Sequence, residues 1–501
     1  MGQAIGEGTL PYFYCNFFPL LVFFQVMLSP IPDKRWDRTL AAHLLNRAGF
    51  GGTPDQIDQL VTMGPRKAVD FFLNADDESA LFPVPDLLEP PARLLFKQRE
   101  KDAATEEEKK AVRKELNQAN AFSMIDLRIW WLNRMRYTSA PLLEKATLFW
   151  HGHFATSNQK VNDPFLMWYQ NDTLRRHALG KFPDLLKAMS RDPAMIRWLD
   201  LGQSRKDHPN ENFAREVMEL FSLGEGNYAE KDIQESSRAF TGYRVKAETG
   251  AFLFQERDFD AAMKTFFGKT GPFTGDDIID IIVAQPQCAR FIGKKLWSFF
   301  VAPEPSEEVV SAVADLLLSN GYDIGETLRR IFGSATFYSS RIIHHQIKGP
   351  VQWMIQTTRM LEIPLPEQSV LENSLTMLGQ VLFAPPNVKG WDGGRAWISA
   401  SSILYRYNLA SYLLSGKARI LGGGSGKTAV IPLEKIAPQE QRIDADRLLD
   451  HLAFRIFNYS ILAKERASYL TFLQKQTAPY SDTVVRDLMQ IMMSTPDYQL
   501  T

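Results

Sequence analysis

The chain has 501 residues, a formal net charge of -1, and an ordinary globular composition of 45% hydrophobic and 23% charged residues. This length allows one large core or roughly two to three domains, and the near-zero charge argues against the basic surface of a general nucleic-acid-binding protein. The two cysteines, Cys15 and Cys288, form no Cys-x-x-Cys motif, so we expect neither a disulfide framework nor a cysteine-based metal or redox site.

Residues 1–28 form an apolar N-terminal segment that the sequence allows to be read in two ways. Residues 10–28 carry no charge and approach the length of a short membrane span, but Pro19 interrupts them. A secretory signal has a basic start, whereas the preceding residues contain Glu7 and no Lys or Arg. The segment is either a signal or anchor of an exported, periplasmic protein, or a misassigned start ahead of Met27 in a cytoplasmic one.

Residues 29–137 are expected to form an N-terminal helical subdomain within a single domain that spans 29–501. Thr53 followed by Pro54 indicates a helix start, and Gly64-Pro65 indicates a turn. Residues 97–117 are highly charged, which predicts one solvated helical arm, and the helical pattern continues to about Tyr137.

The next expected helix begins at Pro141, ends near Trp150, and leads into the sequence Trp150-His151-Gly152-His153. On a regular helix His151 and His153 point about 200° apart, so they cannot share one metal ion. If Gly152 ends or loosens the helix, an extended backbone places both imidazoles on one face, where they can ligate one metal. The alternative interpretation is a pair of polar core residues.

Residues 207–224 are predicted to form one helix, with Pro209 near its start and Gly224 at its end. A helical wheel gathers five polar residues within about 140°, with apolar residues opposite. The polar residues are Glu211, Asn212, Arg215, Glu216 and Glu219. One interpretation is a surface helix with a Glu211–Arg215–Glu219 charge ladder. The other is a polar face that lines a cavity, where carboxylates bind a metal or act as acid and base, with Asp207 and His208 nearby.

After this helix, the clearest strand signal in the chain predicts one small β-hairpin near 243–255. Helices then account for most of the remaining chain. They are expected at Asp276–Ile282, Cys288–Phe300, Ser306–Leu318, Ile324–Phe332, Val351–Met360, 398–414, 444–457, 464–475 and 482–493.

The irregular loop at 385–397 separates two of these helices and is rich in Gly, Pro and Trp. Trp391 and Trp397 offer flat surfaces for a sugar or an aromatic group, or for a cation–π contact with Arg395. A structural loop with glycines at positive φ explains the same composition equally well.

The sequence Gly-Gly-Gly-Ser-Gly-Lys-Thr at 422–428 resembles a phosphate-binding loop but fails its pattern. The motif requires glycine where Leu421 stands, and Pro432 follows where a helix should open. We therefore expect no nucleotide binding.

Several segments in the same order resemble a large bacterial family catalogued as protein of unknown function, DUF 1800. They are AHLLNRAGFG at 42–51, FWHGHFATS at 149–157, DPAM at 192–195, PNENFAREVMELFSLG at 209–224, FTGY at 240–243, ARFIGKKLW at 289–297 and PPNVKGWDGG at 385–394. The resemblance covers about residues 41–499. It implies a cell-envelope setting and a possible partner, because genes of this family often lie beside those of an exported sulfatase-like family (DUF 1501).

The resemblance also bears on the site. Family members often carry a His-Asp pair just after the hairpin, where this sequence has Phe259-Asp260. If that His is a metal ligand in the family, its loss weakens a metal site here. Because the family pattern retains polar residues in both the 149–157 and 209–224 segments, the cavity-lining interpretation of the second segment gains weight.

The sequence thus predicts an all-α, irregular multi-helix protein with one small β-hairpin. The leading functional hypothesis is a hydrolase-like enzyme of the cell envelope that depends on carboxylates or on a divalent metal ion. The expected site comprises His151, His153 and His208 as metal ligands or acid–base groups, Glu211, Glu216, Arg215 and Asp260 as catalytic groups, and Lys389, Trp391 and Arg395 as substrate-binding residues. The alternative is a non-catalytic helical scaffold or accessory protein that works with an exported sulfatase-like partner.

Overall fold

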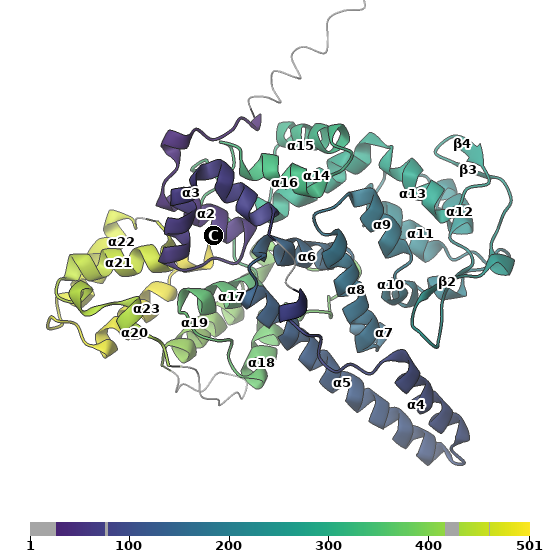
Figure 1. Cartoon of the computed structure of the whole chain (residues 1–501), viewed down its shortest axis with the longest axis horizontal. Helices are drawn as coiled ribbons and strands as arrows, with labels where there is room; N and C mark the ends of the chain where they lie inside the picture. The colour runs from purple at the N-terminus through teal and green to yellow at the C-terminus, as the bar shows by residue number, and fades with distance from the viewer. Residues whose placement is uncertain (1–26, 76–78, 416–429, 460) are drawn as a thin grey trace, which may run out of the picture.

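The computed structural model describes residues 27–75, 79–415, 430–459 and 461–501 (Figure 1). Nearly all of the apolar N-terminal segment, Cys15 and the sequence at 422–428 lie outside these residues. The described chain is predominantly helical with two small antiparallel two-stranded sheets, so the predicted fold class is confirmed. None of the described helices combines the length and apolarity needed to cross a lipid bilayer.

The N-terminal helices follow the helix signals of the sequence. They are α2 (Arg38–Ala48), α3 (Pro54–Leu73), α4 (Pro90–Asp102) and α5 (Glu106–Tyr137). Thr53 caps α3 as predicted, because its side chain accepts from the backbone N–H of Gln56, whose own side chain accepts from the Thr53 N–H. Gly64, at φ 74° and ψ 165°, is not helical, so the range of α3 joins two helices across a kink at the turn predicted for Gly64-Pro65.

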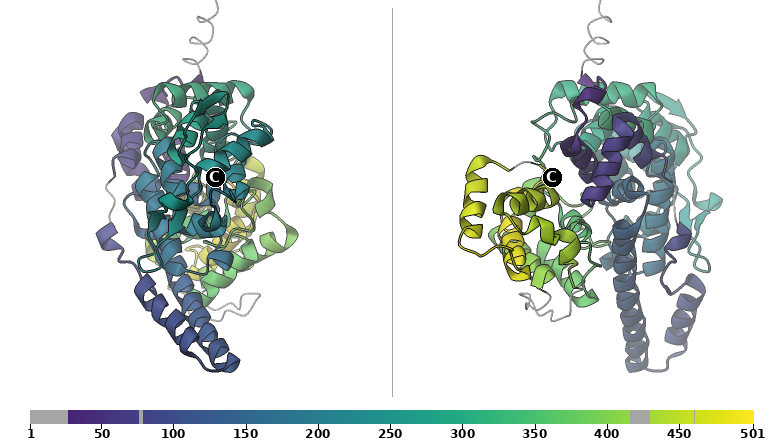
Figure 2. Two further views of the ribbon diagram at one scale, coloured as in Figure 1. Left: turned by 90° about the vertical axis from the view of Figure 1, so that its right-hand side faces the viewer. Right: turned by 60° about the vertical axis from the view of Figure 1, so that its left-hand side comes forward.

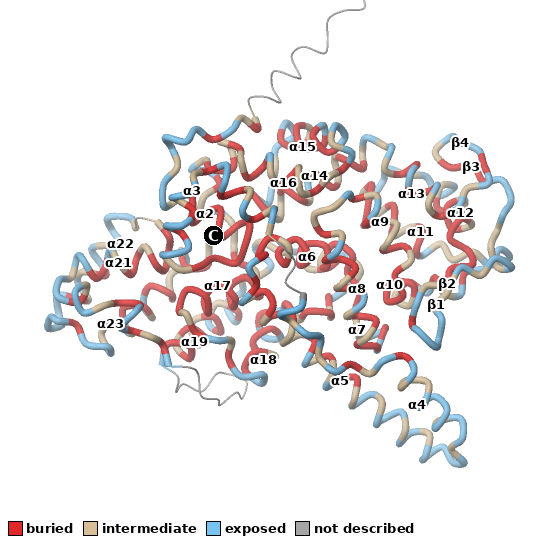
Figure 3. The backbone as a smooth tube through the Cα atoms, viewed as in Figure 1, coloured by how far each residue is buried: buried red, intermediate tan, exposed pale blue. Residues whose placement is uncertain are grey.

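The charged stretch at 97–117 forms an arm of two packed helices, not the single helix predicted from its composition. Thr105 and Glu108 form a capping box at the start of α5, which explains the break. Arg99 and Arg113 of this arm pair with Glu115 and Glu100 of the other helix at 2.7 and 2.6 Å. The arm projects from the body (Figure 1) and is largely exposed (Figure 3), as expected of a solvated arm.

The middle of the chain contains most of the helices around the first of two hydrophobic clusters. These helices are α6 (Pro141–His153), α7 (Asn158–Val161), α8 (Pro164–His177), α9 (Phe182–Ser190), α10 (Pro193–Trp198), α11 (Glu211–Glu219), α12 (Glu230–Ala239), α13 (Gly275–Val283), α14 (Pro286–Phe300), α15 (Glu307–Ser319) and α16 (Ile324–Phe332).

Two β-hairpins interrupt this helical part. Strands β1 (Tyr243–Val245) and β2 (Phe252–Phe254) pair in antiparallel register, which confirms the hairpin predicted near 243–255. Strands β3 (Lys264–Phe266) and β4 (Lys269–Gly271) form a second hairpin that the sequence analysis missed.

The C-terminal helices surround the second hydrophobic cluster. They are α17 (Pro350–Met360), α18 (Gln368–Leu378), α19 (Ala400–Ser415), α20 (Leu433–Ile436), α21 (Ala445–Phe457), α22 (Ala463–Leu473) and α23 (Asp482–Met493). In Figure 2 these helices, coloured green to yellow, gather on one side of the molecule.

Helix α6 lies between the two clusters and contributes to both. Its Trp150 is buried in the first cluster, and its Leu148 is buried in the second. The helices before it also pack onto later ones, since α3 contacts α6 and α16, and α5 contacts α8 and α17. The C-terminal end of α6, which carries the two candidate histidines, is therefore at the centre of the fold.

Candidate functional site

The His-Gly-His segment is the last turn of α6, and the helix does not loosen at Gly152. The helix continues to His153, and Phe154 provides its C-cap. Both imidazoles are buried, with His151 1% and His153 4% exposed. The expected extended backbone at Gly152 is therefore wrong, and the two side chains point to different neighbours, as the 200° separation on a helix requires.

His151 faces the second hydrophobic cluster. Its Nε2 accepts a hydrogen bond of 3.0 Å from the backbone N–H of Phe383, so the ring proton is on Nδ1. The ring lies edge-on against Trp131, with centroids 5.0 Å apart, and 5.7 Å from the ring of Trp391. Burial lowers the pKa of His151 to about 3, which keeps the imidazole neutral.

His153 faces the first hydrophobic cluster. Its Nε2 lies 3.0 Å from the backbone oxygen of Phe221 and donates to it, which leaves Nδ1 buried with no hydrogen-bond partner among the described residues. Burial lowers the pKa of His153 well below its usual value, and the positive charge of Lys295 lowers it further. Both histidines are thus neutral and bonded to backbone groups that follow α11 and α18.

His208 does not join them. Its side chain is 87% exposed in the turn before α11, where Nε2 lies 3.9 Å from Asp207. Across the described residues, no three His, Cys, Asp or Glu side chains gather closely enough to hold a metal ion. The predicted ligand set of His151, His153 and His208 is therefore not formed, and the residues present do not fit a metal held by these histidines.

Helix α11 is shorter than the predicted helix at 207–224. Asn210 caps it by accepting a 2.8 Å hydrogen bond from the N–H of Asn212, and the positive φ of Gly224 (85°) turns the chain after it. The predicted apolar face is buried through Phe213, Ala214, Val217 and Met218. Its polar face stays at least partly accessible, which matches the amphipathic pattern of the sequence.

The charged residues of α11 pair differently from the predicted ladder. Arg215 lies 3.9 Å from Glu211, but its close partner is Glu230 of α12 at 2.8 Å. Glu219 instead accepts a 2.7 Å hydrogen bond from the hydroxyl of Tyr228. Arg215 is thus committed to an ion pair between two helices.

Glu216 is the exception on this face. It is half-buried, and its carboxyl group accepts no hydrogen bond from the residues that the structure describes. Burial raises its pKa, as does the neighbouring Glu219, while Arg215 and Lys389 act in the opposite direction. The positive charge of Lys389, in the loop at 385–397, therefore acts on the Glu216 carboxyl group.

That loop reaches α6 at a single close backbone contact. Gly390 has φ 84°, and a Cβ there would lie 2.2 Å from the backbone oxygen of Gly152, so only glycine fits. The next residue, Trp391, brings its ring to His151. We call the place where these segments meet the motif junction; it comprises His151, Gly152, His153, Glu216, Lys389, Gly390 and Trp391.

Two other predicted site residues, Asp260 and Arg395, do not belong to the motif junction. Asp260 accepts a 2.7 Å hydrogen bond from Arg238 of α12, and its backbone N–H donates to Thr241. Burial alone would raise the pKa of Asp260, but the hydrogen bonds from Arg238 and Ala262 and the charges of Arg238 and Lys264 together outweigh burial and lower the pKa. Arg395 is exposed on a short 3-10 helix, Gly394–Trp397.

Asp192 is a buried polar residue that the sequence analysis did not single out, although it begins the DPAM segment. Its Oδ1 caps α10 through the Met195 N–H at 2.8 Å and accepts from Gln170 at 2.7 Å. Its Oδ2 is buried without a partner among the described residues, and burial raises the pKa of Asp192 to about 7. Gln170 also contacts Thr156, from the segment that carries the two histidines, at 3.0 Å.

Lys295 of α14 lies close to the motif junction and was also missed. Its Nζ is 3.4 Å from the backbone oxygen of Leu220, at the C-terminal end of α11, and 4.8 Å from the ring centre of Phe291. Burial lowers the pKa of Lys295 to about 8. The segment ARFIGKKLW at 289–297 already carried part of the family resemblance, so the sequence marked this region. Nothing in the segment predicts which of its two lysines faces α11.

Glu144 forms a third group that the sequence analysis missed. It is completely buried and accepts hydrogen bonds from Arg134 at 2.5 Å, Arg175 at 2.7 Å and Trp131 at 2.8 Å. This network joins α5, α6 and α8 directly behind the histidines.

Comparison with known proteins agrees with the resemblance seen in the sequence motifs. No curated protein and no solved structure matches the chain. One family model, described as protein of unknown function (DUF1800), matches residues 43–500, which include every residue of the motif junction. Because this match covers nearly the whole chain, the protein belongs to the DUF1800 family.

Proposed function

We propose that this protein is a non-catalytic helical scaffold or accessory protein of the cell envelope that works with an exported sulfatase-like partner. The observation that carries the proposal is the commitment of both buried histidines to backbone groups, with Nε2 of His151 on the Phe383 N–H and Nε2 of His153 on the Phe221 oxygen. Imidazoles in such bonds position the segments that carry their partners. The free lone pair of His153, on Nδ1, is buried.

Further contacts at the motif junction support the same role. Gly390 packs against the Gly152 oxygen, Arg215 bridges α11 and α12, and Glu219 holds Tyr228. The Gly390 contact and the bond from His153 to Phe221 join three family segments to one another, and the bonds of Arg215 and Glu219 fix α11 to the chain at 228–230. This arrangement is expected when a motif maintains a shape. The sulfatase-like partner is inferred from the family resemblance.

The test is complex formation with a purified DUF 1501 protein from the same organism, measured by light scattering after size-exclusion chromatography. A stable complex, together with an increase in the partner's stability or turnover, is the expected result. Glu216→Gln should leave both unchanged, because it removes a carboxylate without removing a packing group. The proposal would be contradicted if no complex forms, or if adding this chain leaves the partner's stability and turnover unchanged.

Glu216 supports a second candidate, a carboxylate-dependent hydrolase without a metal held by the histidines. A half-buried carboxyl with a raised pKa and no hydrogen-bonded partner among the described residues is suited to act as a general acid at mildly acidic pH. Lys389 and Arg215 beside it would attract an anionic substrate group.

This candidate is tested with nitrophenyl esters, phosphates and sulfates as substrates. Glu216→Gln should lower kcat/KM at least 100-fold for the substrate that is turned over. The matched control is Glu225→Gln, which removes an exposed carboxylate a few residues away. Equal activity of the wild type and Glu216→Gln would exclude Glu216 as the catalytic acid and leave the scaffold proposal.

A further inference from the structure

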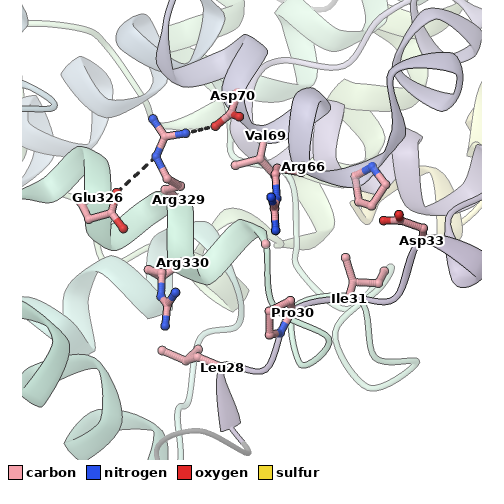
Figure 4. A pocket seen from close by; sticks show the side chains of 12 residues that line it. Leu28, Pro30, Ile31, Asp33, Arg66, Val69, Asp70, Glu326, Arg329 and Arg330 are labelled. Atoms are coloured by element: carbon pink, nitrogen blue, oxygen red, sulfur yellow. Dashed lines mark ion pairs between the residues drawn. The ribbon is translucent and has the colours of Figure 1, made fainter.

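A cavity of about 380 Å³ lies away from the motif junction, between α3, α16 and the segment before α2 (Figure 4). This volume is within the range of small-molecule sites, which is about 300–1,000 Å³. None of the residues that line it belongs to the site predicted from the sequence.

Two helix faces with the same spacing form the sides of this cavity. Helix α3 contributes Arg66, Val69 and Asp70, and α16 contributes residues at 326, 329 and 330, so each helix presents positions i, i+3 and i+4. The apolar part is formed by Val69 with Leu28 and Ile31, both of which are buried. The segment at 28–33 is fixed there, since the N–H of Ile31 donates to the Gly333 oxygen at 2.9 Å.

The charges in the cavity are unequally partnered. Arg329 is neutralised, because its guanidinium pairs with Asp70 of α3 and, at 3.2 Å, with Glu326 of its own helix. Arg66 and Arg330 form no ion pair or hydrogen bond with any described residue. Figure 4 shows the Arg66 side chain extending from α3 into the space beside Arg330 and Pro30.

The helix dipole explains only part of this arrangement. A basic residue in the last turn of α16 is favourable, which accounts for Arg329 and Arg330 as surface residues. It does not account for Arg66, which comes from a different helix and extends its guanidinium into the same cavity. Asp33, a carboxylate that also lines the cavity, lies on the side away from Arg330 (Figure 4). The three arginines and three carboxylates of the lining balance overall, but Arg66 and Arg330 are the arginines without an ion pair to a described residue.

From this geometry we infer that the cavity binds a small organic oxyanion, with Arg66 and Arg330 holding its phosphate or carboxylate group and Leu28, Ile31 and Val69 covering its apolar part. Guanidinium groups match the planar, two-oxygen geometry of these anions. Because the ligand carries an apolar group, it binds more tightly than the bare anion.

Isothermal titration calorimetry on the full chain tests this site with phenyl phosphate and benzoate as probes. Inorganic phosphate presents the anion alone, and benzyl alcohol presents the apolar group alone. We expect saturable binding of phenyl phosphate or benzoate, with at least tenfold weaker binding of both inorganic phosphate and benzyl alcohol. Arg66→Gln and Arg330→Gln should each weaken binding roughly tenfold or more, which corresponds to the loss of one charged hydrogen bond.

The matched control is Arg341→Gln, which removes an exposed arginine that does not line the cavity and should bind the probe like the wild type. Arg66 and Arg330 are exposed as well, so their replacement should leave the thermal unfolding midpoint unchanged and the loss of affinity interpretable. No saturable binding of either organic anion, or equal binding by Arg66→Gln, Arg330→Gln and the wild type, would overturn the inference. Equal affinity for inorganic phosphate and phenyl phosphate would overturn the assignment of the apolar part.

Discussion

At the scale of single residues, the motif junction depends on one glycine. Gly390 must adopt φ 84° and also leave room for the Gly152 oxygen, so an alanine there suffers both a backbone penalty and a clash at 2.2 Å. Gly379, which ends α18, is a useful contrast, because it also has φ 84° and is left-handed, but a Cβ there would meet nothing within 4 Å.

These two glycines give a matched pair of variants. Gly379→Ala should lower the free energy of unfolding by about 1–2 kcal/mol, the cost of a left-handed alanine. Gly390→Ala should lower it by roughly 3 kcal/mol or more, because the clash adds to that cost. Urea denaturation measures both variants. If the two destabilise equally, the loop does not rest on α6 through Gly390.

A second residue-scale effect concerns the buried carboxyl of Asp192. Burial raises its pKa to about 7, above the usual value of 3.8, so the folded protein binds this proton more tightly than the unfolded chain. Between these two pH values, stability must fall as pH rises. At about 1.4 kcal/mol per pKa unit, the full change amounts to at most about 4 kcal/mol.

Asp192→Asn removes this titration while retaining a good helix cap. We expect the variant to gain stability relative to the wild type as pH rises from 4 to 8, by roughly 2–4 kcal/mol. Urea denaturation at several pH values measures the difference. Asp323→Asn, which changes the capping residue of α16, separates the effect of capping from that of the buried proton. Parallel pH curves for wild type and Asp192→Asn would contradict the assignment.

At the scale of helices, Glu144 joins α5, α6 and α8 through two arginines. Burial would raise the pKa of Glu144, but Arg175 and Arg134 together outweigh burial and lower it. The ion pairs therefore stabilise the fold above the usual pKa of glutamate, and this stabilisation is lost as pH falls through the lowered pKa.

Glu144→Gln should lower the free energy of unfolding at pH 7 by about 3–5 kcal/mol, because it removes the buried carboxylate that two buried guanidinium groups share. The control is Glu372→Gln, which breaks the 2.6 Å pair with Arg128 at a partly exposed position and should cost about 1 kcal/mol or less. Chemical denaturation of both variants gives the comparison. A cost for Glu144→Gln no larger than that of the control would mean that the network does not join the helices.

Helix by helix, the sequence predicted what is local and missed what depends on distant contacts. The helices predicted from Asp276 onward are confirmed, and so is the Thr53 cap, because apolar periodicity and capping residues are local signals. Helices α18 and α20 in the same part of the chain were not predicted. The capping box of Thr105 and Glu108 was an equally local signal for the break in the arm, but the high charge of the stretch concealed it. The strands of the second hairpin are as short as those of the first, but they read Lys-Thr-Phe and Lys-Thr-Gly and contain fewer of the apolar residues that marked the first hairpin.

The candidate site shows the same limit. The sequence placed the right segments together, since His151 meets Trp391 and Lys389 acts on Glu216. It could not predict that α6 stays regular through Gly152, because the hydrogen bond that His151 accepts comes from Phe383, 232 residues away. Whether His151 and His153 can share a metal ion or pack as separate core residues therefore depends on tertiary contacts, which the local sequence does not contain.

At the scale of the whole molecule, stability should be uneven between the centre and the arm. Helix α6 contributes to both hydrophobic clusters and carries the motif junction, whereas residues 97–117 of the arm are mostly exposed and held by surface ion pairs. Such pairs contribute little, about 0–1 kcal/mol each. The arm should therefore open locally without unfolding the body.

Hydrogen exchange measures this difference. We expect amides in the outer part of the arm to exchange through local opening, and amides in the middle of α6 to exchange only through global unfolding. Replacing residues 97–115 with a short Gly/Ser linker should change the free energy of unfolding by about 1 kcal/mol or less. The scaffold proposal gives this variant a second use: if it folds normally but no longer forms the complex with the sulfatase-like protein, the arm is the part that reaches the partner. Arm amides as strongly protected as those of α6 would instead show that the arm is integral to the stability of the body.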